Sequence, residues 1–283
     1  MKRAYVVSLA TCLLAVLVLP AQAVLLRYHP KVGVATKHKF TTAGRTEIAA
    51  EAMPEPMRME MEAVMHSLEK ALSETSDTVK VETRLFDSSV KITMAGQTQT
   101  QALPEIRRVT QMDRRARTLK VEEADGEELG GAQQMMPGGP ETWGNWASFM
   151  PFPEKDVKAG DKWSDELSLA SLTGMQGVTI KFTSEMIALT TFQARKCAKI
   201  RTVFEVPLNP DPSQMAGPGE EAAESPTEGI MKGTMLWYYD YENSVYVYAE
   251  GATEMSTSMD MGEAIGGSTT SKALMNMKMT LVE

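Results

Sequence analysis

The feature that most constrains the fold is an alternation of apolar and polar residues with a period of two. Successive side chains of a β-strand point to opposite faces of a sheet, so this period is typical of half-buried strands. It recurs in residues 79–85, 90–94, 118–122, 178–182, 198–206 and 275–281. Residues 234–241 and 244–248 predict a hairpin, because aromatic and β-branched runs flank a polar turn at 242–243.

Short turns between consecutive strands imply antiparallel pairing. We therefore predict a mainly β protein, either as one curved antiparallel sheet, in half-barrel or sandwich form, or as two related β-rich halves. Residues 57–72 are ambiguous, because methionine and leucine recur there at both helical and strand spacing. We interpret this segment as a strand, since the following segment resembles its hairpin partner across residues 73–77.

The first 23 residues have the three parts of a secretory signal. Lys2 and Arg3 precede an apolar run over residues 4–19, and the small residues Ala21 and Ala23 follow. We predict cleavage after Ala23 and an exported protein, periplasmic or extracellular, with no transmembrane span after cleavage. An uncleaved anchor and a lipid attached at Cys12 are the alternatives.

Composition shifts divide the remaining chain. We expect an N-terminal β-rich half over residues 24–129, a Gly/Pro-rich connector over 130–153 and a C-terminal β-rich half over 154–283. Residues 209–229 are rich in Pro, Gly, Glu and Ser, so we predict a disordered loop there. A lysine and a glycine precede a long β stretch twice, at Lys31–Gly33 and at Lys158–Gly160, which indicates either two related halves or chance similarity.

Charge and motifs exclude several classes of function. Removal of Lys2 and Arg3 lowers the basic residues from 29 to 27 against 37 acidic ones, so the net charge moves from −8 to −10. This balance argues against a nucleic-acid partner, and the basic cluster over residues 107–120 fits a solvated strand face. We find no catalytic motif, predict that the protein is not an enzyme, and assign no catalytic, cofactor-binding or metal residue.

The single cysteine after the signal, Cys197, excludes an intrachain disulfide. Its neighbours alternate as a strand would, which predicts a small buried core residue rather than a reactive thiol. The histidines His29, His38 and His66 show no metal-ligand spacing with one another or with Cys197.

Methionine is unusually frequent, with 22 residues in the chain. Three groups alternate: Met57, Met59 and Met61; Met255, Met259 and Met261; and Met275, Met277 and Met279. Residues two apart on a strand share a face. Three interpretations follow: core packing, the lining of an adaptable apolar pocket, or a soft-metal site that holds Cu(I) through thioethers.

Residues 151–261 resemble a bacterial exported β-rich family of unknown function. The resemblance rests on Phe152-Pro153-Glu154-Lys155, on the Gly-Asp-x-Trp motif at Gly160-Asp161-Lys162-Trp163, and on Lys232-Gly233 before a late strand. It implies no active site. We expect Gly160 to permit a tight turn, Asp161 to cap it and Trp163 to anchor the next strand in the core.

These observations predict a non-enzymatic envelope protein. The expected partner is either an apolar ligand such as a lipid or another protein of the envelope. Strongly bent antiparallel sheets can enclose an apolar groove, as in bacterial lipoprotein carriers, which is an analogy of fold alone. A methionine-rich Cu(I)-binding protein and a purely structural envelope component are the alternatives.

Overall fold

The computed structural model describes residues 23–51, 53–125, 151–168, 179–208, 227–260 and 268–282. Within these ranges every regular element is a β-strand, as predicted. The strands are β1 (Ala35–Ala50), β2 (Met57–Glu74), β3 (Thr78–Met94), β4 (Gln97–Leu103), β5 (Ile106–Asp113), β6 (Thr118–Asp125), β7 (Lys162–Ser168), β8 (Thr179–Phe192), β9 (Arg195–Pro207), β10 (Thr227–Asp240), β11 (Val245–Asp260) and β12 (Ser268–Val282). No helix in these ranges is long and apolar enough to cross a membrane.

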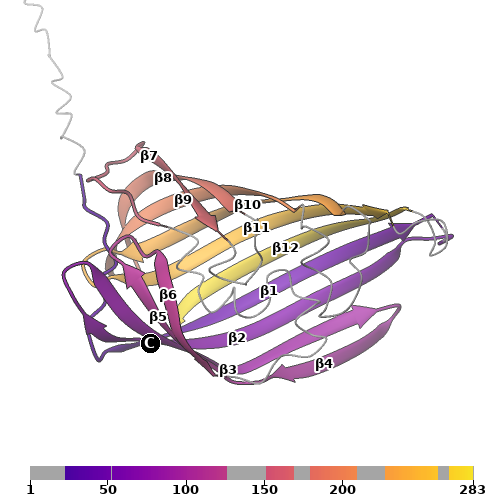
Figure 1. The fold of residues 1–283 in the computed structure, drawn as a ribbon, viewed down its shortest axis with the longest axis horizontal. Coiled ribbons are helices and arrows are strands. Elements are labelled where there is room, and N and C mark those ends of the chain that lie inside the picture. Colours follow the sequence, from indigo (N-terminus) through magenta and orange to yellow (C-terminus); the bar gives the residue numbers. More distant parts are fainter. Residues whose placement is uncertain are drawn as a thin grey trace, which may run out of the picture.

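The strands form one antiparallel sheet with the order β6-β5-β3-β2-β1-β12-β11-β10-β9-β8-β7, and β4 pairs with β3 beside this path. Strands β1 and β12 pair from Lys37 opposite Val282 to Ala50 opposite Thr269. This long pairing joins the two predicted halves, so the alternative of one continuous sheet is confirmed. Figure 1 shows the long central strands side by side, with β5, β6 and β7 at one end of the molecule.

Two local expectations are settled by the strand pairing. The ambiguous segment 57–72 is a strand, β2, which pairs with β1 and β3. The segments 79–85 and 90–94 are not two strands but parts of one, β3. Between these two parts, Asp87 of β3 has a positive φ of 45°, and the pairing with β2 shifts register between Val64 and His66. This irregularity explains why the alternation is interrupted within one strand.

The predicted loop over residues 209–229 ends earlier than expected. Its last three residues belong to β10, where Thr227, Glu228 and Gly229 pair with β11. Backbone pairing with β11 therefore orders these three residues, which have little apolar surface of their own. Residues 209–226, the signal segment up to residue 22, and residues 130–150 of the connector lie outside the described residues.

The largest buried cluster lies on one face of the sheet. Its aromatic members include Trp237, Tyr239 and Tyr246 from the hairpin of β10 and β11. Two segments that precede strands pack on this face, and their main chains pair between Val24 and Val157. The ring centroids of Phe152 and Tyr239 are 4.6 Å apart, so the end of the predicted connector docks in the core.

The same turn precedes the first strand of each predicted half. Gly33 and Gly160 have φ values of 83° and 90°, which favour glycine. Gly33 donates its N–H to the carbonyl of Ala71, and Gly160 donates to that of Met186. Both carbonyls come directly before a register shift in the neighbouring strand. The short repeat in the sequence therefore corresponds to a repeated structural device.

Candidate functional site

Methionines from five strands share the face of the sheet that carries the main core. We call this side the methionine face and define it by Met59, Met61, Met65, Met186, Met231, Met235, Met255, Met275, Met277 and Met279. The register gives its rows, because residues paired across antiparallel strands point to the same side. One row runs Met235–Gly251–Met277–Thr42–Ala63. The next runs Gly233–Thr253–Met275–Gly44–Met61.

Large and small residues alternate along these rows because the large side chains lie over the small ones. A Cβ added to Gly251 would lie 2.1 Å from the sulfur of Met235 and 2.5 Å from the carbonyl oxygen of Thr234. A Cβ added to Gly233 would lie 2.1 Å from Cζ of Phe204. The glycines therefore make room for a methionine and a phenylalanine of the adjacent strand.

Exposure changes along the methionine face. Met65 and Met279 are buried in the main cluster, and Met277 packs against it. Farther along the strands Met59, Met231, Met255 and Met275 are half-buried, and Met94 of β3 on the same side is 45% exposed. The face therefore continues from a packed core into a part that a ligand can reach. Flexible thioether side chains suit an adaptable apolar lining.

The described residues contain no group of three or more His, Cys, Asp or Glu side chains that could hold a metal ion. His38 Nε2 lies 2.9 Å from the carbonyl oxygen of Tyr246, and His66 Nδ1 lies 3.2 Å from that of Asp87. His29 Nδ1 pairs with Glu74, so the three histidines contact different parts of the sheet.

Cys197 is fully buried, as predicted from its alternating neighbours. Burial, and then the charge of Asp240, raises the pKa of its thiol to about 11. At neutral pH the side chain is therefore a protonated thiol, which is a poor nucleophile.

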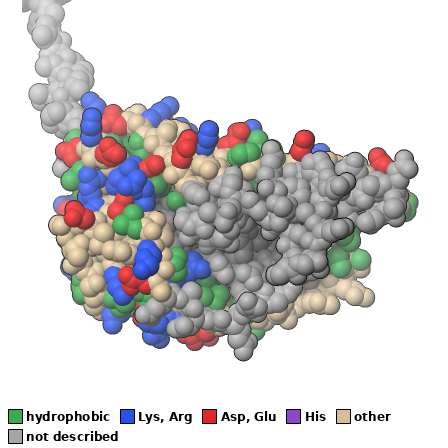
Figure 2. All heavy atoms as spheres, viewed as in Figure 1, with side chains coloured by type: hydrophobic (Ala, Val, Ile, Leu, Met, Phe, Trp, Pro, Cys, Tyr) green, Lys and Arg blue, Asp and Glu red, His purple; other side chains and the backbone are tan. Residues whose placement is uncertain are grey.

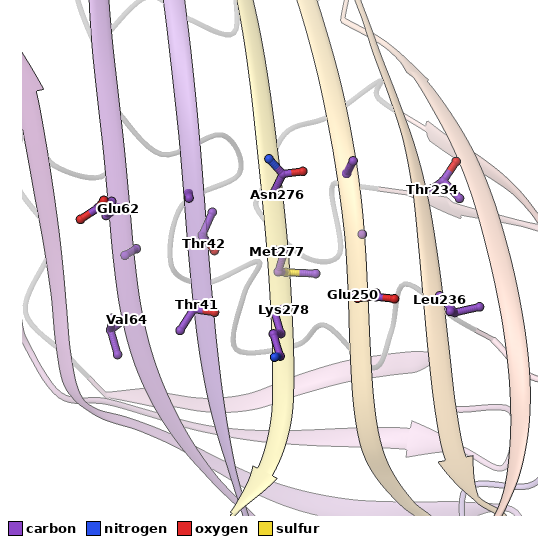
Figure 3. A pocket seen from close by; sticks show the side chains of 14 residues that line it. Thr41, Thr42, Glu62, Val64, Thr234, Leu236, Glu250, Asn276, Met277 and Lys278 are labelled. Atoms are coloured by element: carbon purple, nitrogen blue, oxygen red, sulfur yellow. The ribbon is translucent and has the colours of Figure 1, made fainter. Parts of the chain in front are cut away.

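The opposite side of the sheet carries a hollow of about 760 Å³ that spans β2, β1, β12, β11 and β10. Two complete rows line it: Val64–Thr41–Lys278–Glu250–Leu236 and Glu62–Ala43–Asn276–Ala252–Thr234. Thr42, Ala63, Gly251 and Met277, from the row between these two, also border it. Figure 3 shows side chains from these five strands around it. We call this side the charged face. Sequence reasoning missed this hollow, because its strands adjoin only after β1 pairs with β12.

Opposite charges are matched across neighbouring strands of the charged face. Lys232 Nζ lies 3.1 Å from Glu205, and Arg201 Nη2 lies 2.5 Å from Glu185. At the hollow, the Tyr248 hydroxyl donates to Glu250 at 2.8 Å, and burial followed by this carboxylate raises the pKa of Tyr248 to about 12. Local pairing of this kind supports strand register.

The basic cluster over residues 107–120 is also matched by acids. Arg115 Nη2 lies 2.6 Å from Asp165, and Arg117 Nε lies 2.6 Å from Asp113. Figure 2 shows basic and acidic side chains interleaved at the end of the molecule where Figure 1 places β5, β6 and β7. The prediction of a solvated strand face is wrong, because Arg114, Arg115 and Arg117 lie in the turn between β5 and β6 and Arg108 is buried.

The Gly-Asp-x-Trp motif has the structural roles expected of it. Gly160 takes a positive φ, and the Asp161 carboxylate accepts the N–H of Lys158 at 2.9 Å, which closes the turn. Trp163 packs against the main cluster and donates its indole N–H to the carbonyl of Pro151 at 2.9 Å. The motif therefore positions β7.

No protein-family model matches this sequence, and no curated protein matches it. Two solved structures from Pseudomonas aeruginosa show a distant likeness. OccK5 (OpdH) has 7% sequence identity and a TM-score of 0.28, with 90% of this chain and 100% of that chain covered. OpdQ has 8% identity and a TM-score of 0.23, with 89% and 100% covered. Both TM-scores lie below 0.5, so the likeness is too distant to indicate a function.

Proposed function

We propose that this chain is an exported, non-enzymatic envelope protein that binds an apolar ligand of the lipid class on the methionine face. One observation carries the proposal: the methionine face extends beyond the packed core, where Met59, Met255 and Met275 remain half-buried. The signal-like N-terminal segment supports export.

A lipid chain suits this surface for two physical reasons. Rows of methionine alternate with glycine, alanine and threonine, so the surface has ridges and gaps of side-chain size. Burial of each CH₂ group contributes about 0.8 kcal/mol, and flexible thioethers can follow the shape of a chain. The hollow of the charged face differs in that Glu62, Glu250 and Lys278 stand among its lining residues.

A matched pair of substitutions in β12 tests the proposal. Met275→Lys places a charge on the methionine face, whereas Leu274→Lys places one on the opposite face, where Leu274 is already 42% exposed. Mass spectrometry of lipid that co-purifies with each protein, and titration with a fluorescent fatty acid, provide the readout. We expect lipid in the parent and in Leu274→Lys, and a large loss in Met275→Lys. Absence of lipid from the parent, or equal loss in both variants, would overturn the proposal.

Binding of Cu(I) is the second candidate function, because Met235 and Met277 flank Gly251 in one row and offer two soft sulfur donors. Replacement of Met275, Met277 and Met279 by leucine keeps the apolar volume and typically costs under about 1.5 kcal/mol for each residue. Titration with Cu(I) against a competing chelator separates the candidates. A lipid-binding protein retains lipid in the triple variant, and parent and variant bind copper weakly and equally. Tight copper binding that disappears in the variant would favour the metal function.

A further inference from the structure

The strand β4 presents an open edge with an unusual sequence. Residues 97–102 are all exposed, and among the described strands β4 pairs only with β3. Residues 97–101 read Gln-Thr-Gln-Thr-Gln, which is the same in both directions. Two copies of such a strand, paired antiparallel, place identical residues opposite each other when the centre of the pair is Gln99.

The other two edges of the sheet are protected in a way that β4 is not. Natural edge strands avoid unwanted pairing through charged side chains, proline or bulges. Strand β6 carries Lys120, Glu122, Glu123 and Asp125, and β7 carries Lys162, Asp165 and Glu166. Strand β4 has no charged residue and no proline. The contrast within one sheet indicates that the β4 edge is kept available for pairing.

The geometry of the turn before β4 decides which backbone groups are available. Ala95 and Gly96 form a two-residue turn with φ values of 49° and 78°, and Met94 pairs with Gln97. In such a hairpin the pair that closes the turn is the hydrogen-bonded one. Alternate residues of β4, Thr98 and Thr100, therefore direct their N–H and C=O groups away from β3.

We propose that a second copy of this chain pairs with β4 along this edge, antiparallel and about a two-fold axis at Gln99. Thr98 of each copy then exchanges two backbone hydrogen bonds with Thr100 of the other, which gives four in total. Gln99 faces Gln99 of the second copy as a non-hydrogen-bonded pair, with Cα atoms about 4.5 Å apart. Gln97 faces Gln101, so the glutamines form an uncharged amide ladder.

The pairing has a consequence for the whole surface. Gln99 pairs with Ile92 of β3, and Ile92 pairs with Met61, so the glutamines lie on the same side as the methionine face. Residues opposite each other in the new pair also share a side, so the methionine faces of the two copies become one surface. The two-fold pair uses the β4 edge of both copies, so it closes as a dimer and does not extend into a fibre. This inference stands independently of the proposed lipid binding.

Charge at the two-fold axis gives a sharp test. In Gln99→Glu or Gln99→Lys, like charges meet directly across the pair, whereas a mixture of the two variants brings opposite charges together. Sedimentation velocity from low micromolar to near-millimolar concentration is the readout, because a short strand pair should dimerise weakly. We expect a concentration-dependent dimer of the parent, monomers of each variant alone, and recovery of the dimer in the equimolar mixture. A parent that is monomeric at every concentration, or variants that dimerise as the parent does, would overturn the proposal.

Cysteine substitution tests the register independently of charge. Gln99→Cys should form an intermolecular disulfide on mild oxidation, because its Cα spacing to the same residue of the second copy suits the bond. Thr98→Cys is the matched control, since it faces position 100 of the second copy and not itself. The native Cys197 is buried and does not interfere. Equal cross-linking of both variants, or none of Gln99→Cys, would contradict a two-fold axis at Gln99.

Discussion

At the scale of single residues, His38 is the buried group whose protonation should most affect stability near neutral pH. Its side chain is 2% exposed, and burial lowers its pKa from 6.5 to about 4, against a smaller opposing effect of the Tyr246 carbonyl. The unfolded chain therefore takes up a proton at a higher pH than the folded one. Stability from the neutral imidazole is complete above about pH 6.5 and is lost as the pH falls toward 4.

We predict that the free energy of unfolding falls by roughly 3 kcal/mol between pH 7 and pH 4 on account of His38, since one pKa unit corresponds to about 1.4 kcal/mol. His38→Gln, which keeps a donor for the Tyr246 carbonyl, should have a flatter pH profile than the parent. Urea unfolding at both pH values measures the difference. Parallel profiles of parent and variant would show that His38 titrates normally.

Glu69 acts in the opposite direction and must be separated from His38. Tyr28 donates a hydrogen bond to Glu69, and burial, which outweighs this bond, raises the pKa of the Glu69 carboxyl. A raised pKa gives stability that is present below pH 4.5 and is lost as the pH rises through the folded-state value. The comparison of parent and His38→Gln is therefore best repeated with Glu69→Gln in both backgrounds.

At the scale of elements, the contact between Gly233 on β10 and Phe204 on β9 is a specific cross-strand pair. The phenylalanine ring covers the glycine, and its nearest atom would lie 2.1 Å from an added Cβ. Aromatic cover of a glycine in a neighbouring strand stabilises a sheet at a position without a side chain. The ring also packs against both the main cluster and the smaller one around Ile180 and Phe182.

We predict that Gly233→Ala destabilises the protein by about 1–3 kcal/mol, the usual cost of overpacking. In the background of Phe204→Ala the same change should cost far less, because the obstructing ring is gone. A double-mutant cycle by urea unfolding measures this coupling. Additive effects would show that Gly233 is required for another reason. Gly160→Ala is a useful comparison, because its Cβ would meet nothing within 4 Å and only its φ of 90° resists substitution.

The elements also show where reasoning from sequence succeeds and where it stops. Alternation located β3, β6 and β8 to β12, and it predicted the burial of Cys197, because both depend on neighbours along the chain. It did not mark β1, β4, β5 or β7. The pairing of Met235 with Gly251 and of Met275 with Gly44 depends on register between strands. One sequence carries little information on register, so the methionine groups were visible but not their common rows. Edge strand β4 was missed because its Gln-Thr repeat has no apolar residue to alternate.

At the scale of the whole molecule, the decisive contact is the pairing of β1 with β12, which joins segments from opposite ends of the chain. The strands that flank it belong to different predicted halves, with β2 beside β1 and β11 beside β12. No short-range pattern specifies this pairing, which is why the sequence left one sheet and two halves as alternatives. The same pairing creates the hollow of the charged face and makes the methionine rows continuous.

Continuity across β1 and β12 predicts that the two halves unfold together. Lys37 to Ala50 are hydrogen-bonded into the ladder with Val282 to Thr269, so neither half can open without exposing a long central edge. Native-state hydrogen exchange in low urea should therefore give the same opening free energy for amides of β2 and of β10, which lie on opposite sides of this pair. Asn276→Pro, in the middle of β12, should lower both values together, since proline removes a donor from a central strand. If amides of β2 and β10 open with clearly different free energies, and the proline substitution lowers only one of them, the sheet consists of two independently stable units.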